Sequence, residues 1–173
     1  MVFAKSVLLC ATILSGIALV SHGASVGSYL DYCPSGWSEH YGRCFMFVKE
    51  KRSWADSELI SEASLPQMNC QKLGGNLASV HTEDDYSFLK DLVKKLDATA
   101  PSFWIGMSDC QKEGTWMWSD GTRVDFTLWN PGEPNNVGEE DCVQGNWPNS
   151  NGWNDLSCGR DLGSVCVLRY FYG

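Results

Sequence analysis

Oxygen-bearing side chains concentrate in the late part of the sequence, between Leu128 and Ser157. They lie in three short motifs, Glu133-Pro134-Asn135, Glu140-Asp141-Cys142 and Trp153-Asn154-Asp155. Calcium in proteins takes about six to eight oxygen ligands from carboxylates, amide carbonyls and water. The side chains that offer this mixture are Glu133, Asn135, Glu140, Asn154 and Asp155. They predict a calcium site whose remaining coordination positions are open to a ligand.

The alternative is an acidic surface loop in which Asn and Asp residues only form turns. Each motif alone fits that alternative. The three motifs, however, occur together, and each stands near a tryptophan or a cysteine that can anchor it, which favours the metal site. No segment has the alternating Asp and Asn ligands and the final Glu of an EF-hand. The sequence therefore predicts a calcium site of another type.

The composition favours one globular domain and excludes some partners. The chain has 173 residues, which is room for one domain, and 43% of them are hydrophobic. Thirteen basic residues against twenty-one acidic ones give a net charge of −8. This charge disfavours nucleic acid, whose phosphates need a positive surface, and it disfavours attraction to anionic lipid.

Residues 1–24 have the pattern of a secretory signal peptide. Lys5 precedes a nearly uninterrupted apolar run over 7–20, and small residues follow it. The run is shorter than the roughly 20 residues that span a bilayer, so we expect a cleaved signal; an uncleaved anchor is the alternative. A short lead over 25–32 then precedes a domain over 33–170. The mature protein is expected to be secreted and not inserted in a membrane.

Seven cysteines remain after cleavage, in an oxidising compartment where cysteines are normally paired. Spacing alone cannot choose among the possible pairings. Zinc is not indicated, because the sequence has no Cys-x-x-Cys pair and only His81 lies near the centre of the chain. We expect disulfides with one cysteine left over.

The first helix is expected to begin near Ser53. Its hydroxyl can cap the helix, and Asp56 follows three residues later. Pro66 is expected to interrupt this helix, which would resume over 70–73. The stretch 59–68 is either an insertion into the helix or a bulged loop.

A second helix and several strands complete the expected elements. Thr82 caps the helix, whose apolar residues as far as Leu96 share one face. Short apolar runs between turn residues predict strands over 41–48, 103–106, 115–118, 142–143 and 165–168. The expected fold class is α+β.

These motifs together resemble the signature of C-type lectin domains. The resemblance covers residues 33–168 and rests on the three late motifs, the cysteine framework, Trp104-Ile105-Gly106-Met107 and Gly74-Gly75-Asn76-Leu77-Ala78. It implies two helices packed on short antiparallel sheets, with a long calcium-binding loop region. It also implies a cis bond between Glu133 and Pro134. The disulfides that it implies are Cys33–Cys44, Cys70–Cys166 and Cys142–Cys158.

In this family the calcium itself touches sugar, which gives the five ligands a second role. Each of two sugar hydroxyls accepts a hydrogen bond from an Asn amide and donates one to a Glu carboxylate. The residues expected at the sugar are Glu133, Asn135, Glu140 and Asn154, with Trp147 as a stacking surface. The Glu-Pro-Asn order accompanies mannose-type sugars in the family, whereas Gln-Pro-Asp accompanies galactose. The resemblance therefore implies mannose-type glycans on microbial or glycoprotein surfaces as partners, in innate recognition.

A second, auxiliary calcium is also implied by the resemblance. Its ligands would be Asp109, Glu113, Asn136, Glu140 and Asp141. Asn136 stands where many members have Asp, which removes one charge from that site. The alternative is that Asp109 and Glu113 are exposed turn residues.

Cys110 is the cysteine left over. The segment around it resembles small lectins of fish and the related type II antifreeze proteins, in which a cysteine follows the tryptophan that aligns with Trp129. Here Asn130 stands at that position. Cys110 is then either a buried or capped thiol, or it forms an intermolecular disulfide in a homodimer, which would raise avidity.

Two other functions are alternatives to the lectin. Glu133 and Glu140 could be the carboxylate pair of a glycosidase, but a metal between them would keep both ionised and remove the general acid. Ser/His/Asp catalysis is not favoured, because His40 and His81 lie outside the late loops, so we expect no enzyme. The second rival is an ice-binding or protein-binding member of the family without sugar binding.

Overall fold

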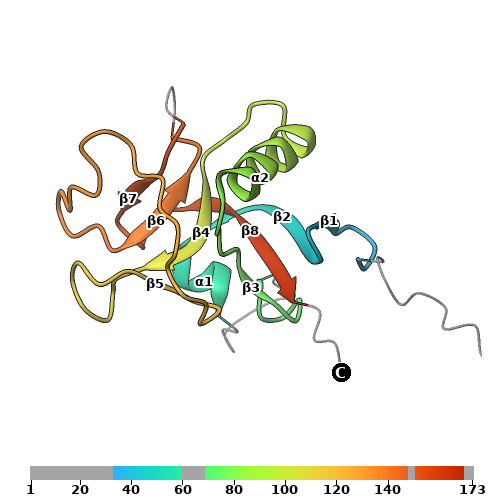
Figure 1. Ribbon diagram of the computed structural model, residues 1–173, viewed down its shortest axis with the longest axis horizontal. Helices are drawn as coiled ribbons and strands as arrows, with labels where there is room; N and C mark the ends of the chain where they lie inside the picture. The colour runs from blue at the N-terminus through green and yellow to red at the C-terminus, as the bar shows by residue number, and fades with distance from the viewer. Residues whose placement is uncertain (1–32, 60–68, 148–150, 170–173) are drawn as a thin grey trace, which may run out of the picture. The chain divides into compact units, whose positions relative to one another are not determined.

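The computed structural model describes residues 33–59, 69–147 and 151–169 (Figure 1). The expected signal peptide over 1–24 and the lead over 25–32 lie outside these residues. So do Pro66 and nearly all of the stretch 59–68.

One eight-stranded sheet and two helices make up the described domain, which confirms the α+β class. The helices are α1 (Trp54–Glu58) and α2 (Glu83–Leu96). The strands are β1 (Ser38–His40), β2 (Arg43–Arg52), β3 (Asn76–Leu77), β4 (Phe103–Ser108), β5 (Met117–Trp118), β6 (Cys142–Gly145), β7 (Asn154–Leu156) and β8 (Leu162–Arg169). None of the described helices is long and apolar enough to cross a membrane.

The strands form one mixed sheet in place of the separate antiparallel sheets that were expected. Their order is β1-β2-β8-β4-β6-β7, with β3 beside β8 and β5 beside β4. β4 and β8 run parallel, with Phe103 opposite Gly163, and the other pairs are antiparallel. β4 is buried along its whole length, as a strand covered on both faces must be. Figure 1 shows the long irregular segment after β5 on the same side as β6 and β7.

Both helix caps form as expected. The Ser53 hydroxyl accepts the Asp56 N–H at 3.1 Å, and the Thr82 hydroxyl accepts the Asp85 N–H at 3.0 Å. The expected continuation of the first helix over 70–73 is wrong, because these residues form turns. The Cys70 N–H donates instead to an earlier backbone oxygen, and its sulfur is bonded to Cys166.

The two ends of the stretch that follows α1 are held together. The Asn69 side-chain amide donates to the Leu59 carbonyl at 2.5 Å, and the Cys70 N–H donates to the Ser57 carbonyl at 2.9 Å. The next residue along continues this pairing, because its N–H donates to the Glu58 carbonyl at 3.2 Å. The chain therefore leaves α1 and returns at nearly the same place.

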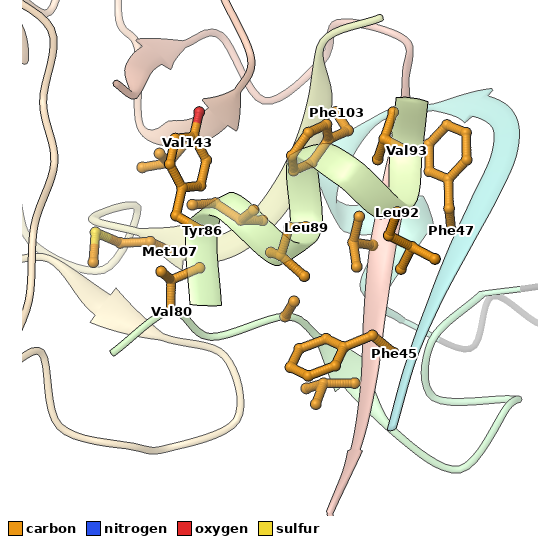
Figure 2. Packing of buried hydrophobic residues seen from close by; sticks show 14 of the residues in the cluster. Phe45, Phe47, Val80, Tyr86, Leu89, Leu92, Val93, Phe103, Met107 and Val143 are labelled. Atoms are coloured by element: carbon orange, nitrogen blue, oxygen red, sulfur yellow. The ribbon is translucent and has the colours of Figure 1, made fainter. Parts of the chain in front are cut away.

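The main core lies between α2 and the sheet (Figure 2). Tyr86, Leu89 and Val93 form the buried face of α2, at the spacing of helical turns. They belong to one cluster with Phe45 of β2 and Phe103 of β4. This core holds α2 against the sheet, and β6 and β7 are attached to the sheet through β4.

Three disulfides join distant parts of the chain. They are Cys33–Cys44, Cys70–Cys166 and Cys142–Cys158, the pairs that the resemblance implies. The third one links the start of β6 to the segment after β7. It therefore joins the Glu140 arm, the segment that leads into β6, to the Asn154 arm, which is β7 and the residues up to Cys158.

Candidate functional site

The late loop is attached to Trp153, the residue just before β7, by backbone hydrogen bonds. The Trp153 N–H donates to Leu128 O at 2.6 Å, and the Asn130 N–H donates to Trp153 O at 2.9 Å. Trp129 and Trp153 form an isolated bridge between the two segments. Trp153 is fully buried, so this attachment is anchored in the core.

Asn130 connects the segment just before β7 to the turn that begins at Glu133. Its side-chain oxygen accepts the Gly152 N–H at 2.8 Å, and its carbonyl accepts the Glu133 N–H at 2.9 Å. Sequence reasoning noticed Asn130 only as the place of a missing cysteine. No local pattern could have revealed this junction, because all of its partners except Glu133 are distant in sequence.

The Glu133-Pro134-Asn135 turn rests on the buried carboxylate of Asp155. Asp155 Oδ1 accepts the Asn135 N–H at 3.1 Å, and Oδ2 accepts the Asn136 N–H at 2.7 Å. The Glu133–Pro134 bond is cis, as the resemblance implies. Asn136 has a φ of +49°, a conformation that Asn tolerates better than most residues. Asp155 thus positions the turn as well as offering oxygen.

The polar side chains of the first motif lie against each other. The Asn135 amide donates to Glu133 Oε2 at 2.5 Å, so a hydrogen-bond donor and an acceptor stand side by side. Glu140 joins this group through its backbone N–H, which donates to Asn136 Oδ1 at 2.8 Å. The Asn154 amide donates to the carbonyl oxygen of Asp155. Hydrogen bonds of side chains or backbone therefore link Glu133, Asn135, Glu140 and Asp155, and Asn154 joins them as the neighbour of Asp155 in the chain.

The electrostatics of this group favour a cation. Burial raises the pKa of Glu133 to about 7, helped by a hydrogen bond to Asp155 and by the charges of Asp155 and Glu140. Burial and the Asp155 charge also raise the pKa of Glu140. Within the described ranges, no Lys, Arg or His forms an ion pair with these three carboxylates. Because the negative charge is uncompensated by protein cations, the donor set fits a divalent ion.

The carboxylates are not yet gathered as tightly as a bound ion would hold them. Over the described part of the chain, no three carboxylates have oxygens within 4.8 Å of one another. Binding an ion at the typical oxygen distance of about 2.3–2.6 Å would draw the side chains closer.

The residues of the auxiliary site differ in burial. Asp109 is only 2% exposed, so the interpretation of it as an exposed turn residue is wrong, whereas Glu113 is exposed. Asp109 Oδ2 accepts the Gly114 N–H at 2.7 Å, and Oδ1 is buried without a hydrogen-bond partner. The Asp109 N–H donates to Asp141 O at 3.1 Å. A buried carboxylate oxygen without a partner suits a cation ligand.

The tryptophans divide as expected between anchors and surface. Trp104, Trp118 and Trp153 are buried, and Trp37, Trp54, Trp116 and Trp129 are partly buried. Trp147, after β6, is 45% exposed. It is therefore the tryptophan that a ligand can reach.

Cys110 is an exposed free thiol, so its interpretation as a buried thiol is wrong. Its sulfur lies 3.5 Å from Cys158 Sγ and 3.9 Å from Cys142 Sγ. The leftover cysteine thus stands directly beside the disulfide that ties the late motifs together.

A Ser–His–Asp arrangement that sequence reasoning missed lies outside the late loops. His81 Nδ1 is 2.7 Å from Asp125 Oδ1, and His81 Nε2 is 3.2 Å from Ser79 Oγ. Ser79 is 1% exposed and donates its hydroxyl hydrogen to Asp120 Oδ2 at 2.6 Å. A nucleophile must reach its substrate and give its proton to the base, so this arrangement does not support hydrolysis.

Comparison with known proteins agrees with the fold. The family described as Lectin C-type domain matches residues 63–168. The lactose-binding lectin l-2 of Anguilla japonica is 47% identical over 166 residues, which cover 93% of each chain. Herring type II antifreeze protein superposes with a TM-score of 0.70 at 34% identity, over 80% of this chain and 100% of that one. The cow C-type carbohydrate-recognition domain of CD23, solved in the presence of GlcNAc2Man3 oligosaccharide, gives 0.67 at 30% identity, over 82% and 98%.

Proposed function

This chain belongs to the C-type lectin domain family, and from that premise we propose that it is a secreted lectin that binds mannose-type sugars through calcium. The single observation that carries the proposal is the hydrogen-bonded group of Glu133, Asn135 and Asp155, whose carboxylates form no ion pair with a Lys, Arg or His of the described residues. Secretion is supported by the three disulfides, which persist in oxidising compartments.

The chain's own residues divide the work at this site. Glu133, Asn135, Glu140, Asn154 and Asp155 would hold the ion. A bound calcium would supply open coordination positions for two sugar hydroxyls. The Asn135 amide would donate to one hydroxyl while the Glu133 carboxylate accepts from it, because these groups already stand side by side. Asp155 would keep the turn in place through its two backbone hydrogen bonds.

Elution from immobilised mannan tests the proposal. The protein is expected to bind in calcium and to be released by a chelator or by free mannose, with galactose much less effective. The Glu-Pro-Asn order and the likeness to a domain solved with a mannose-containing oligosaccharide support this specificity. Retention that persists in excess chelator would contradict the calcium role, and equal elution by galactose would contradict the mannose specificity.

A galactoside is the second candidate ligand. It is favoured by the Anguilla japonica relative, whose name states that it binds lactose. The mannan experiment separates the two candidates, because a galactoside-specific protein would not be retained on mannan, whereas immobilised lactose would retain it. The family's antifreeze members favour a third outcome, ice binding without sugar binding. Thermal hysteresis in a protein that binds no sugar would support that outcome.

Calcium affinity is expected to fall as the pH drops below about 7. The pKa of Glu133 in the metal-free site is raised to about 7, so below that pH calcium must displace a proton. The apparent affinity then falls by about tenfold per pH unit for each displaced proton, and the raised pKa of Glu140 steepens the loss at lower pH. Calcium titrations between about pH 8 and pH 5 measure this slope. An affinity that stays constant over that range would show that neither carboxylate binds the ion.

Two further assignments complete the proposal. An auxiliary calcium would lie at Asp109, Glu113, Asn136, Glu140 and Asp141, and the unpartnered Asp109 oxygen supports it. The protein is not proposed to be an enzyme, because the Ser–His–Asp arrangement has a buried serine. Its proposed biological setting is innate recognition of microbial glycans.

Cys110 is expected to join two copies of the chain through a disulfide. A single sugar on one calcium binds near the millimolar level, about −4 kcal/mol, and two linked sites gain roughly 10²–10⁴ in avidity. The exposure of Cys110 supports this role. Non-reducing electrophoresis should show a dimer that Cys110→Ser converts to a monomer. A monomeric band that is the same in both proteins would contradict the dimer.

A further inference from the structure

Three sulfur atoms meet beside the late loops. Cys110 Sγ lies 3.5 Å from Cys158 Sγ and 3.9 Å from Cys142 Sγ, and the last two are bonded to each other. Among the described His, Cys, Asp and Glu residues, these three cysteines are the one group whose potential metal-binding atoms, here the three sulfurs, all lie within 4.8 Å of one another. Since two of the sulfurs already share a disulfide, the group is a free thiol beside a disulfide, not a metal site.

We propose that Cys110 exchanges with this disulfide inside the folded chain and forms a Cys110–Cys158 isomer. The Cys110 thiol loses its proton, and the thiolate attacks Cys158 Sγ. The new bond joins Cys110 to Cys158, the Cys142–Cys158 bond breaks, and Cys142 leaves as a thiolate that takes up a proton. One disulfide and one thiol are present before and after, so the exchange needs no oxidant or reductant.

Distance and access select Cys158 as the sulfur that is attacked. It is the nearer of the two, and it is partly exposed, whereas Cys142 is fully buried. The thiol that the exchange releases is therefore a buried one. A buried free cysteine behaves as a small apolar side chain and is inert, so the surrounding fold can accommodate the product.

The resting thiol lies beside the disulfide bond and not on its axis. Attack on a disulfide is in line with the S–S bond, whose length is about 2.05 Å. The attacking sulfur would then be about 2 Å farther from Cys142 Sγ than from Cys158 Sγ. The two distances here are 3.5 and 3.9 Å. Exchange therefore requires the Cys110 side chain to rotate, which its exposed position allows.

The exchange would release the covalent link between the two arms of the site. Cys142 directly follows Glu140 and Asp141, and Cys158 follows the Asn154 and Asp155 arm. In the Cys110–Cys158 isomer, the Glu140 arm keeps only noncovalent ties, such as the Asp109 N–H to Asp141 O hydrogen bond. This consequence rests on the proposed function, whereas the exchange itself does not.

Thiol mapping of the full chain tests the exchange. The monomeric fraction, in which Cys110 is not engaged in the intermolecular disulfide proposed above, is incubated under nitrogen without reductant at about pH 8. It is then quenched in acid and labelled with N-ethylmaleimide in denaturant, and the labelled cysteine is found by peptide mass spectrometry. We expect label on both Cys110 and Cys142, with at least about a tenth on Cys142; a tenfold ratio corresponds to about 1.4 kcal/mol between the isomers. Label confined to Cys110, label on Cys158 in place of Cys142, or no label would overturn the proposal.

Two controls separate the exchange from its functional consequence. Cys110→Ser removes the attacking thiol and should leave Cys142 and Cys158 unlabelled; label on Cys142 in this variant would overturn the proposal, because another group would then have released it. Excess calcium should lower the label on Cys142 several-fold by holding the Glu140 arm in place. If Cys142 is labelled equally with and without calcium, the exchange stands and its coupling to the calcium site is refuted.

Discussion

Glu133→Gln is expected to lower calcium affinity by at least about 10–100-fold. Removing a residue that only hydrogen-bonds to a metal ligand already costs about that much, and Glu133 is expected to be a ligand itself. The substitution keeps the shape of the side chain and an oxygen that can accept from the Asn135 amide. It removes one of three carboxylate charges from a site that no Lys, Arg or His in the described part of the chain neutralises through an ion pair. Isothermal titration with calcium measures the affinity, and retention on mannan should be lost with it.

Glu139→Gln is the matched control for this experiment. Glu139 lies in the same loop, is exposed, and is not among the expected ligands. The control removes the same charge from the same segment, so it should bind calcium almost as the unaltered protein does. If Glu133→Gln and Glu139→Gln both retain full calcium affinity, the ion is not held by Glu133 and the proposed function is wrong.

Trp153→Ala is expected to lower the free energy of unfolding by about 3–5 kcal/mol, the usual cost of truncating a buried aromatic residue. Trp153 is fully buried, and its ring meets those of Tyr86, Trp118, Phe126 and Trp129 nearly edge to face, at centroid distances of 5.9–6.0 Å. Its backbone also holds the late loop, so calcium and sugar binding should be lost together with stability. Denaturant unfolding followed by circular dichroism measures the change.

Trp147→Ala provides the comparison. Trp147 is 45% exposed, so its removal should change the free energy of unfolding by no more than about 0.5 kcal/mol. If Trp147 stacks on sugar, this variant should bind mannan more weakly while remaining as stable as the unaltered protein. A Trp153→Ala protein that is as stable as Trp147→Ala and still binds calcium would show that the cluster around Trp153 does not support the late loop.

Local sequence patterns predicted the features that depend on residues close together in the chain. Thr82 caps α2 because the hydroxyl and the amide that it meets are three residues apart, and the apolar face of α2 follows from helical spacing. The strand expected over 103–106 is extended to 108, and it lies at the centre of the sheet. The disulfide pairs, by contrast, came from a family resemblance, because spacing alone leaves many pairings open.

Features that depend on distant partners could not be predicted. The parallel pairing of β4 with β8 joins segments about sixty residues apart along the chain, and β3 has only two residues, Asn76 and Leu77. The junction at Asn130 and the burial of Asp109 are set by partners on other loops. Within the site, residue types and order predicted the five candidate ligands, whereas the support of the Glu133 turn by Asp155 came only from the fold.

The hydrogen bonds that hold Leu59 to Asn69 and Ser57 to Cys70 make this part of the domain suitable for protein engineering. Because the two flanks are joined to each other and Cys70 is bonded to β8, the described fold itself holds the two attachment points together. An inserted flexible linker between such points adds only about 0.6 kcal/mol of closure cost for each doubling of its length. A foreign epitope or a second binding module grafted between residues 59 and 69 should therefore leave the rest of the domain folded.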